Sequence, residues 1–241
     1  MRERFASVDR ADRGEVSAKS TPTDLVSESD LAAEELIRTR LSEARPDDGI
    51  LGEEGDDVAG SSGRRWVVDP LDGTVNFLFG IPQWAVSVAV EDASGQAVAG
   101  VVYDAMREEC WSATVGAAPR CNGVEVRASE REDLATAMVA TGFGYDREVR
   151  EVQGALAARL LPLVRDIRRL GSAALDLAWT AAGRYDAYYE RGVKHWDVAA
   201  GALLCSCAGL EVHPLGPLPP SEGGILVAPA ALAEGLLALV R

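Results

Sequence analysis

The chain has 241 residues, of which 47% are hydrophobic and 26% charged, an ordinary composition for a folded protein with a sizeable core. Asp and Glu outnumber Lys and Arg by 38 to 24, and the net charge of -14 disfavours nucleic acid and favours cations as partners. No apolar run approaches the roughly 18 residues of a membrane span, and the first residues lack the apolar stretch of a secretory signal, so we expect a cytoplasmic protein. The four cysteines are expected to be free thiols.

The first half of the chain predicts one helix followed by a run of strands. After a polar start, residues 27–44 predict a helix, because Ser27 and Asp30 form a capping box ahead of apolar residues at helical spacing. A short strand or turn, "DGILGEEG", ends in acids, and "RWVVD" predicts a buried strand that Pro70 should stop at Asp69. Three more strands joined by turns are predicted over residues 84–92, 96–104 and 108–115.

The second half predicts alternating helices and strands. Strands are predicted over residues 138–143, 185–190 and 223–228, and helices over residues 148–163, 172–183, 197–209 and 231–240. Adjacent strands followed by alternating helices and strands are typical of a layered α/β protein, and they do not fit a simple Rossmann fold or a barrel. We expect one compact unit with an N-terminal part, residues 1–128, and a C-terminal part, residues 129–241.

The stretch "VVDPLDGTVNF" is the most informative in the chain. It ends a buried strand on Asp69 and places a second acid, Asp72, three residues later. Two carboxylates so close would repel each other unless a cation lay between them. Gly73 permits a close backbone approach, Thr74 supplies a hydroxyl, and a helix that begins here would point free amides at the same place. The stretch therefore predicts a corner that can hold a cation and an anion together.

Two other places carry acids in comparable settings. Glu53 follows the apolar "GIL", and Asp197 opens a predicted helix directly after Trp196. Carboxylate oxygens suit Mg²⁺, Mn²⁺ or Ca²⁺, whereas the lack of a histidine cluster or paired CxxC disfavours zinc. Taken singly, each acid has an ordinary alternative: Asp69 as a turn residue, Asp197 as a helix cap and Glu53 as a solvated loop acid.

The sequence resembles the inositol monophosphatase family of magnesium-dependent, lithium-sensitive sugar phosphatases, and in particular its inositol-1-phosphatase-like branch. The matching segments run in family order between Lys19 and Gly209: "KSTPTDLVSESD", "GEEG", "DPLDGTVNF", "GSAALDLA", "DAYYE" and "WDVAAG". The third and last are the most specific. The resemblance implies a five-layered αβαβα sandwich with mixed β-sheets, the sugar phosphatase fold, usually assembled as a homodimer.

The resemblance also implies roles for individual residues. It implies metal ligands at Glu53, Asp69, the carbonyl of Leu71, Asp72 and Asp197. It implies that Glu53 and Thr74 activate the attacking water and that the amides of Gly73 and Thr74 hold the phosphate. The residues that it places at the substrate are Arg168, Ala173, Glu190 and, near the entrance, Lys19.

The expected reaction is magnesium-dependent hydrolysis of a small phosphorylated polyol or sugar. The resemblance implies two or three Mg²⁺ ions, which Mn²⁺ can replace, and we expect them to offset the charge that protects a phosphate dianion from water. Inositol 1-phosphate is the expected substrate, with fructose 1,6-bisphosphate and other sugar phosphates as alternatives. Neither nucleic acid nor a membrane is expected as a partner.

Two rival functions come from different classes. The segment "CNGVEVR" has the CX5R spacing of a cysteine phosphatase, but its Asn-Gly pair predicts a tight turn into a strand rather than a phosphate-binding loop before a helix. The other rival is a metal-dependent binding protein that kept the acidic pocket and lost turnover, because a fold and a motif do not guarantee activity.

Overall fold

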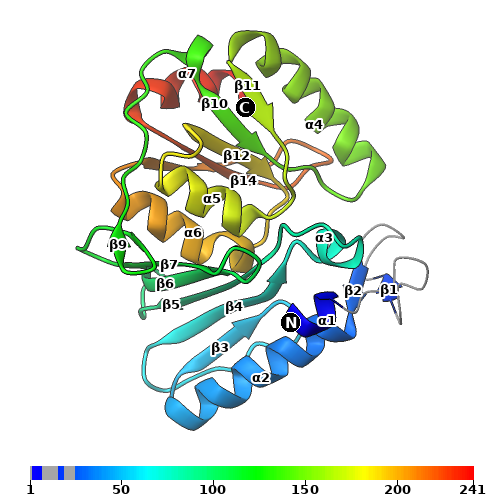
Figure 1. Ribbon diagram of the computed structural model, residues 1–241, viewed down its shortest axis with the longest axis vertical. Helices are drawn as coiled ribbons and strands as arrows, with labels where there is room; N and C mark the ends of the chain where they lie inside the picture. The colour runs from blue at the N-terminus through cyan, green and yellow to red at the C-terminus, as the bar shows by residue number, and fades with distance from the viewer. Residues whose placement is uncertain (1, 7–15, 19–24) are drawn as a thin grey trace.

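The seven-stranded sheet forms the lower half of the molecule (Figure 1). A computed structural model describes residues 2–6, 16–18 and 25–241. The sheet has the order β3-β4-β5-β6-β7-β8-β9, with β3 parallel to β4 and every later pair antiparallel. Its strands are β3 (Gly49–Gly52), β4 (Arg65–Asp72), β5 (Ala85–Glu91), β6 (Ala97–Asp104), β7 (Glu109–Thr114), β8 (Arg120–Cys121) and β9 (Val124–Glu125).

The five-stranded sheet forms the upper half, in the order β11-β10-β12-β14-β13. It is mixed, because β10 is parallel to β11 and β12, whereas β14 is antiparallel to β12 and β13. Its strands are β10 (Met138–Thr141), β11 (Asp166–Arg168), β12 (Ala187–Arg191), β13 (Glu211–Leu215) and β14 (Gly224–Ala228). A separate pair, β1 (Val16–Ala18) and β2 (Leu25–Ser27), lies near the short helix α1 (Arg2–Ala6).

Helices and sheets alternate in five layers, which confirms the expected αβαβα sandwich (Figure 1). Helix α2 (Glu28–Ala44) covers one face of the seven-stranded sheet. Helices α5 (Ala173–Ala181) and α6 (His195–Cys207) lie between the two sheets, and α4 (Arg147–Leu160) and α7 (Ala230–Val240) cover the far face of the five-stranded sheet. A short helix, α3 (Thr74–Leu78), follows β4.

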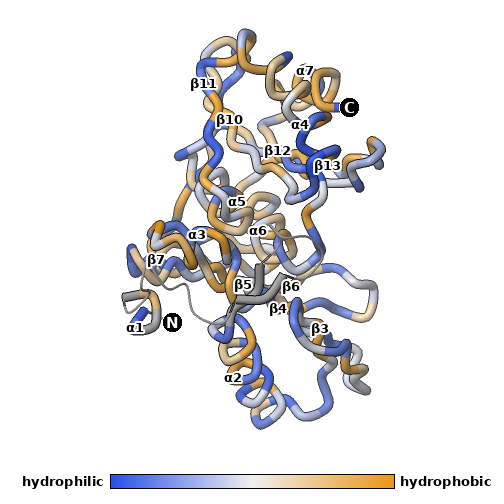
Figure 2. Tube along the Cα trace, turned by 90° about the vertical axis from the view of Figure 1, so that its right-hand side faces the viewer, coloured by the Kyte–Doolittle hydropathy of each residue, from blue (hydrophilic) through white to orange (hydrophobic). Residues whose placement is uncertain are grey.

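The main core lies in the middle layer. It joins side chains of both sheets to α5 and α6, which lie near the centre of the view in Figure 2. Nearly every residue of α5 is buried, as expected for a helix enclosed between two sheets. Close contact of α6 with β6 depends on Gly100, where a Cβ would lie 3.0 Å from the Cα of Ala200. The C-terminal half of the chain therefore covers one face of the sheet that the N-terminal half forms.

The predicted elements are present, with differences at their ends. The helix predicted over residues 148–163 ends at Leu160, because the chain tightens into a 3-10 turn around Pro162. Strands β11 and β13 were not predicted. The three residues of β11 carry too little periodicity, and Pro214 interrupts the pattern of β13. Among the described residues, the helices are all too short or too polar to pass through a lipid bilayer.

Candidate active site

The acidic corner begins inside β4 rather than at its end. The prediction that Pro70 stops the strand at Asp69 is wrong, because β4 continues to Asp72. Asp69 pairs with Ser87 and Asp72 with Ala85, so β4 has one more residue than β5 across this step. This bulge accommodates the proline and turns the backbone at the two acids. The Asp69 carboxylate then accepts a 2.9 Å hydrogen bond from the Leu71 amide.

Gly73 connects β4 to α3 in a left-handed conformation. Its φ is 95°, and a Cβ there would lie 2.9 Å from the Gln83 carbonyl oxygen, so both the turn and the close approach require glycine. Thr74 follows as the first residue of α3. Its hydroxyl lies 2.9 Å from Asp30 Oδ1 and 3.0 Å from the Leu71 carbonyl oxygen. A hydroxyl has one proton, so it can donate to only one of these acceptors at a time.

Asp30 is a site residue that the sequence reasoning missed. It was interpreted as the acid of a helix capping box, yet it is fully buried in α2 and contacts Thr74. A signal existed, because Asp30 is the last residue of the matching segment "KSTPTDLVSESD", at the start of α2. The partner, however, lies 44 residues away and could not be read from local spacing.

Asp72 and Asp197 are held at the N-terminal ends of the two middle-layer helices. Asp72 Oδ2 accepts hydrogen bonds from the Ser172 hydroxyl at 2.5 Å and the Ala174 amide at 2.7 Å, at the start of α5. Asp197 Oδ2 accepts from the Lys194 amide at 2.6 Å, at the start of α6. Partly unpaired amides at helix starts favour negative charge, which explains why acids are tolerated there.

The electrostatics of these acids are strongly perturbed. Burial raises the pKa of Asp69 well above its usual value, and the charges of Glu53, Asp72 and Asp197 raise it further. Desolvation raises the pKa of Asp72 to about 6, although the hydrogen bond from Ser172 lowers it. Desolvation also raises the pKa of Asp197, and Asp72 adds to that rise. Desolvation of the carboxylates, to which their mutual repulsion adds, produces this pattern, which is typical of functional sites.

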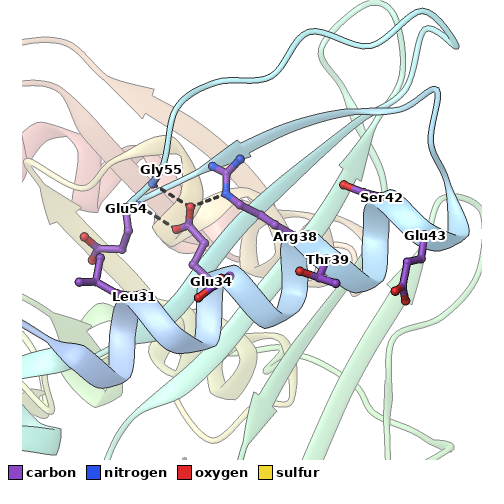
Figure 3. A pocket seen from close by; sticks show the side chains of 9 residues that line it. Leu31, Glu34, Arg38, Thr39, Ser42, Glu43, Glu54 and Gly55 are labelled. Carbon is purple, nitrogen blue, oxygen red and sulfur yellow. Dashed lines mark hydrogen bonds and ion pairs between the residues drawn. The ribbon is translucent and has the colours of Figure 1, made fainter.

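These residues share one cavity of about 450 Å³. Of the predicted site residues, the cavity is lined by Glu53, Asp69, Leu71, Asp72, Gly73, Thr74, Ala173, Glu190 and Asp197. A second hollow, of about 620 Å³, lies along α2 and contains none of them (Figure 3). We therefore place the candidate active site at the smaller hollow, because the perturbed acids converge there.

The donor set suits a hard cation, although the acids do not form a finished ligand shell. Several carboxylates line the cavity together with Leu71, whose backbone offers a carbonyl oxygen, and such oxygen donors are the ligands of Mg²⁺ and Mn²⁺. As the side chains stand, no three acidic, histidine or cysteine groups in the described part of the chain are close enough to hold an ion. Several carboxylate oxygens are instead engaged by protein donors. The fit therefore rests on donor chemistry and on the convergence of buried charge.

The predicted substrate residues line the cavity only in part. Glu190, on β12, accepts a 2.8 Å hydrogen bond from the Tyr188 hydroxyl, and desolvation raises its pKa to about 7. Arg168 is not among the lining residues: its guanidinium donates to Asp166 at 2.5 Å. Arg169 lines the cavity instead, because successive side chains of an extended chain point to opposite sides. Lys19 lies outside the described residues.

The cysteine-phosphatase alternative finds no support in the structure. Cys121 ends β8, and Asn122 and Gly123, with φ of 49° and 80°, turn the chain directly into β9. Burial raises the pKa of the Cys121 thiol, whereas a nucleophilic cysteine needs a lowered one. As predicted, this segment is a tight hairpin, and it does not form a phosphate-binding loop.

Comparison with known proteins finds a matching family model and several similar chains. A model of the "Inositol monophosphatase family" matches residues 1–241. The "Inositol-1-monophosphatase SuhB" of Mycobacterium tuberculosis is 46% identical over 245 residues, covering 95% of this chain and 82% of the relative. The "Nus factor SuhB" of Pseudomonas aeruginosa is 42% identical, covering 85% and 77%. The crystal structure of extragenic suppressor protein suhB from Bartonella henselae superposes with a TM-score of 0.88 at 35% identity, covering 99% of this chain and 93% of that one.

Proposed function

This chain belongs to the inositol monophosphatase family, and from that premise we propose that it is a magnesium-dependent phosphatase whose preferred substrate is inositol 1-phosphate. One observation carries the proposal: acids from three separate segments face one cavity, next to a threonine hydroxyl paired with a buried aspartate. Fructose 1,6-bisphosphate and other small sugar phosphates are the alternative substrates. The residue roles that follow are part of the proposal.

Glu53, Asp69, Asp72, Asp197 and the Leu71 carbonyl are the proposed metal ligands. Members of this family are generally metal-dependent, and the all-oxygen donor set favours Mg²⁺, with Mn²⁺ as a substitute. Two or three bound ions would neutralise phosphate charge and lower the pKa of a bound water. The raised pKa values of the aspartates support this assignment, because a cation would relieve their repulsion.

Thr74 and Glu53 are proposed to handle the attacking water. The Thr74 hydroxyl can accept a hydrogen bond from water while it donates its own proton in a 2.9 Å hydrogen bond to Asp30 Oδ1. This arrangement orients the oxygen lone pairs of Thr74 toward the cavity. Glu53, which lines the same cavity, is the proposed general base. The backbone amides of Gly73 and Thr74 are proposed to donate hydrogen bonds to the phosphate.

Glu190, Ala173 and Arg169 of the cavity lining are proposed to bind the polyol. Glu190 can accept hydrogen bonds from ring hydroxyls, and Tyr188 fixes its orientation through the 2.8 Å bond. Ala173 contributes a small side chain to the cavity lining, which leaves room for a ring. Lys19 is the proposed entrance residue. We propose that Arg169, which lines the cavity, takes the role expected of Arg168.

A substrate panel tests the proposal. Phosphate release should be measured with Mg²⁺ for inositol 1-phosphate, fructose 1,6-bisphosphate, histidinol phosphate and phosphoadenosine phosphate. We expect inositol 1-phosphate to give the highest kcat/KM and EDTA to abolish turnover. Phosphate release that is unaffected by EDTA, or absent from every substrate at saturating Mg²⁺, would contradict the proposal.

Three further properties complete the proposal. We expect millimolar lithium to inhibit the enzyme, in keeping with the family resemblance, and insensitivity at high millimolar lithium would count against the branch. We expect a homodimer, which sedimentation equilibrium would test. A cytoplasmic location fits the four free cysteines, because thiols persist in a reducing compartment.

A binding role without turnover is the second candidate function. The relative from Pseudomonas aeruginosa is named a Nus factor, so close relatives of this chain carry names that do not describe catalysis. For this chain, such a role would be supported if Mn²⁺ bound tightly at the cavity while the substrate panel released no phosphate. The intact Thr74–Asp30 pair favours catalysis, because binding a metal alone does not require it.

A further inference from the structure

The backbone that carries Glu53 is held by three successive amide hydrogen bonds. The Glu53 amide donates to the Val68 carbonyl of β4 at 3.2 Å. The next two amides, of Glu54 and Gly55, donate to the two carboxylate oxygens of Glu34 at 2.8 Å each. Figure 3 shows Glu34 reaching from α2 to both amides. The loop after β3 is therefore fixed by the sheet on one side and by a helix side chain on the other.

Glu34 is itself rigidly held. Its side chain is 2% exposed, and Arg38, one helical turn further along α2, donates from Nε to Glu34 Oε1 at 2.6 Å. A buried carboxylate is costly unless it is paired and hydrogen-bonded. Two amides and a guanidinium meet that requirement, and bonds to charged groups are about twice as strong as neutral ones. The carboxylate thus has a fixed position relative to the axis of α2.

The glycines of "GEEG" are explained by the same contact. A Cβ at Gly52 would lie 2.2 Å from Glu34 Oε1, and one at Gly55 would lie 2.8 Å from the same atom. Both glycines let the Glu34 carboxylate lie directly against the loop backbone. The motif therefore combines Glu53, which lines the cavity, with two glycines that leave space for the Glu34 carboxylate of α2.

We propose that Glu34 is a positioning residue for Glu53: it ties the loop to α2 and so fixes where the Glu53 carboxylate enters the cavity. The inference rests on the metal-ligand role of Glu53 in the proposed function. Displacement of a reacting group by about 1 Å can cost a hundredfold in rate. Residues that orient metal ligands typically contribute 10-fold to 100-fold in metal affinity or activity when they are removed.

Glu34→Gln is the first test, with Glu35→Gln as the matched control. Gln keeps one acceptor oxygen but turns an NH2 group toward the second amide, so one of the two loop bonds is lost. Glu35 is the neighbouring residue of α2, is exposed and forms no hydrogen bond to the loop. The readouts are hydrogen exchange of the Glu54 and Gly55 amides and the dissociation constant for Mn²⁺, from electron paramagnetic resonance of free Mn²⁺.

We expect Glu34→Gln to speed exchange of at least one loop amide about tenfold and to weaken Mn²⁺ binding by roughly 10-fold to 100-fold. The concentration of Mg²⁺ that gives half-maximal phosphate release should rise by a similar factor, whereas KM for inositol 1-phosphate should change less than about threefold. Glu35→Gln should match the wild type in every readout. Glu34→Asp, which keeps the charge but is too short to reach both amides, should show the same direction and keeps the test open if Gln impairs folding.

The inference is overturned if Mn²⁺ affinity in both Glu34 variants stays within twofold of the control, or if loop exchange is unchanged. It is also overturned if KM for the phosphate ester rises while metal affinity is preserved, because the tether would then serve the substrate. A wild-type protein that binds Mn²⁺ but releases no phosphate refutes the proposed function alone. In that case, the exchange and Mn²⁺ measurements still decide the role of Glu34.

Discussion

The two walls of the cavity differ in how their side chains are held. On the acid wall, Asp69, Asp72 and Asp197 each accept hydrogen bonds from backbone amides within a turn of a strand bulge or a helix start. On the substrate wall, formed by the residues proposed to bind the polyol, Glu190 is oriented by a tyrosine hydroxyl, and Arg169 donates to the Phe143 carbonyl at 3.3 Å. The acid wall is therefore held mainly by backbone amides, with one side-chain bond from Ser172, whereas the substrate wall relies on long side chains that reach their partners.

This difference predicts separate roles for the two walls, one in holding ions and one in selecting the substrate. A wall fixed by backbone geometry can keep the spacing of ion ligands, whereas a wall built from side chains can vary with little effect on the fold. Substitutions on the acid wall should lower turnover on every substrate. Substitutions on the substrate wall should change the preference among phosphate esters.

The largest expected effect comes from Asp69→Asn. The substitution removes a charge from the buried centre of the acid wall while keeping its size, so we expect turnover to fall by several orders of magnitude. Initial rates with inositol 1-phosphate at saturating Mg²⁺ measure this loss. Asp47→Asn, in the exposed loop between α2 and β3, is the control and should retain wild-type rates. Near wild-type activity of Asp69→Asn would refute the assignment.

Thr74→Val and Asp30→Asn should each lower kcat by about a hundredfold or more, the usual contribution of a positioned proton-transfer group. Valine keeps the shape of Thr74 and removes the hydroxyl that contacts Asp30. Because the two act as one unit, the double variant should be little worse than either single one. Fully multiplicative losses would show that Asp30 acts independently of Thr74.

Arg169→Met should raise KM for inositol 1-phosphate about tenfold, in line with a lost hydrogen bond to a charged group. Arg168→Met should leave KM within about twofold, because its guanidinium is engaged by Asp166 and is not among the cavity-lining groups. Steady-state kinetics on the two adjacent variants tests the one-residue correction directly. The reverse order would restore the role first expected of Arg168.

The smallest expected effect is a pH-dependent stabilisation by Mg²⁺. Between the ordinary Asp value of 3.8 and the raised pKa of Asp72, about 6, the metal-free folded state holds more protons than the unfolded state. Stability of the metal-free protein should therefore fall as pH rises through this window. Mg²⁺ should offset that loss, raising Tm by about 5 °C at pH 8 and by about 0–1 °C at pH 5. Calorimetric scans at both pH values, with the protein in EDTA as the metal-free reference, measure the rise in Tm. Equal rises at pH 5 and pH 8 would contradict the electrostatic account.

The sequence was informative where the chemistry is local. Spacing and turn preferences predict the acidic corner of Asp69 and Asp72, with Gly73 and Thr74 directly after it. They also predict the hairpin at Asn122 and Gly123. The layered fold followed from the order of periodic segments. In these places neighbours in the chain are also neighbours in space.

Long-range partners could not be predicted. The capping box gave Asp30 a sufficient local explanation, so its contact with Thr74 stayed hidden. Arg168 was expected from the family resemblance alone, because the three residues of β11 carry too little periodicity to show which side chains face the cavity. The continuation of β4 past Pro70 depends on a bulge paired with β5, which the proline alone argued against.

The placement of α5 and α6 between the two sheets has a consequence for synthesis on the ribosome. A nascent chain that has emerged as far as β9 would carry the seven-stranded sheet with its inner face uncovered, including Val102 and Trp111, which are buried in the finished protein. Bare apolar sheet surface attracts other chains and chaperones. Helix α6 also carries Asp197. A product that terminates before α6 would therefore expose an apolar surface prone to association and would lack this proposed metal ligand.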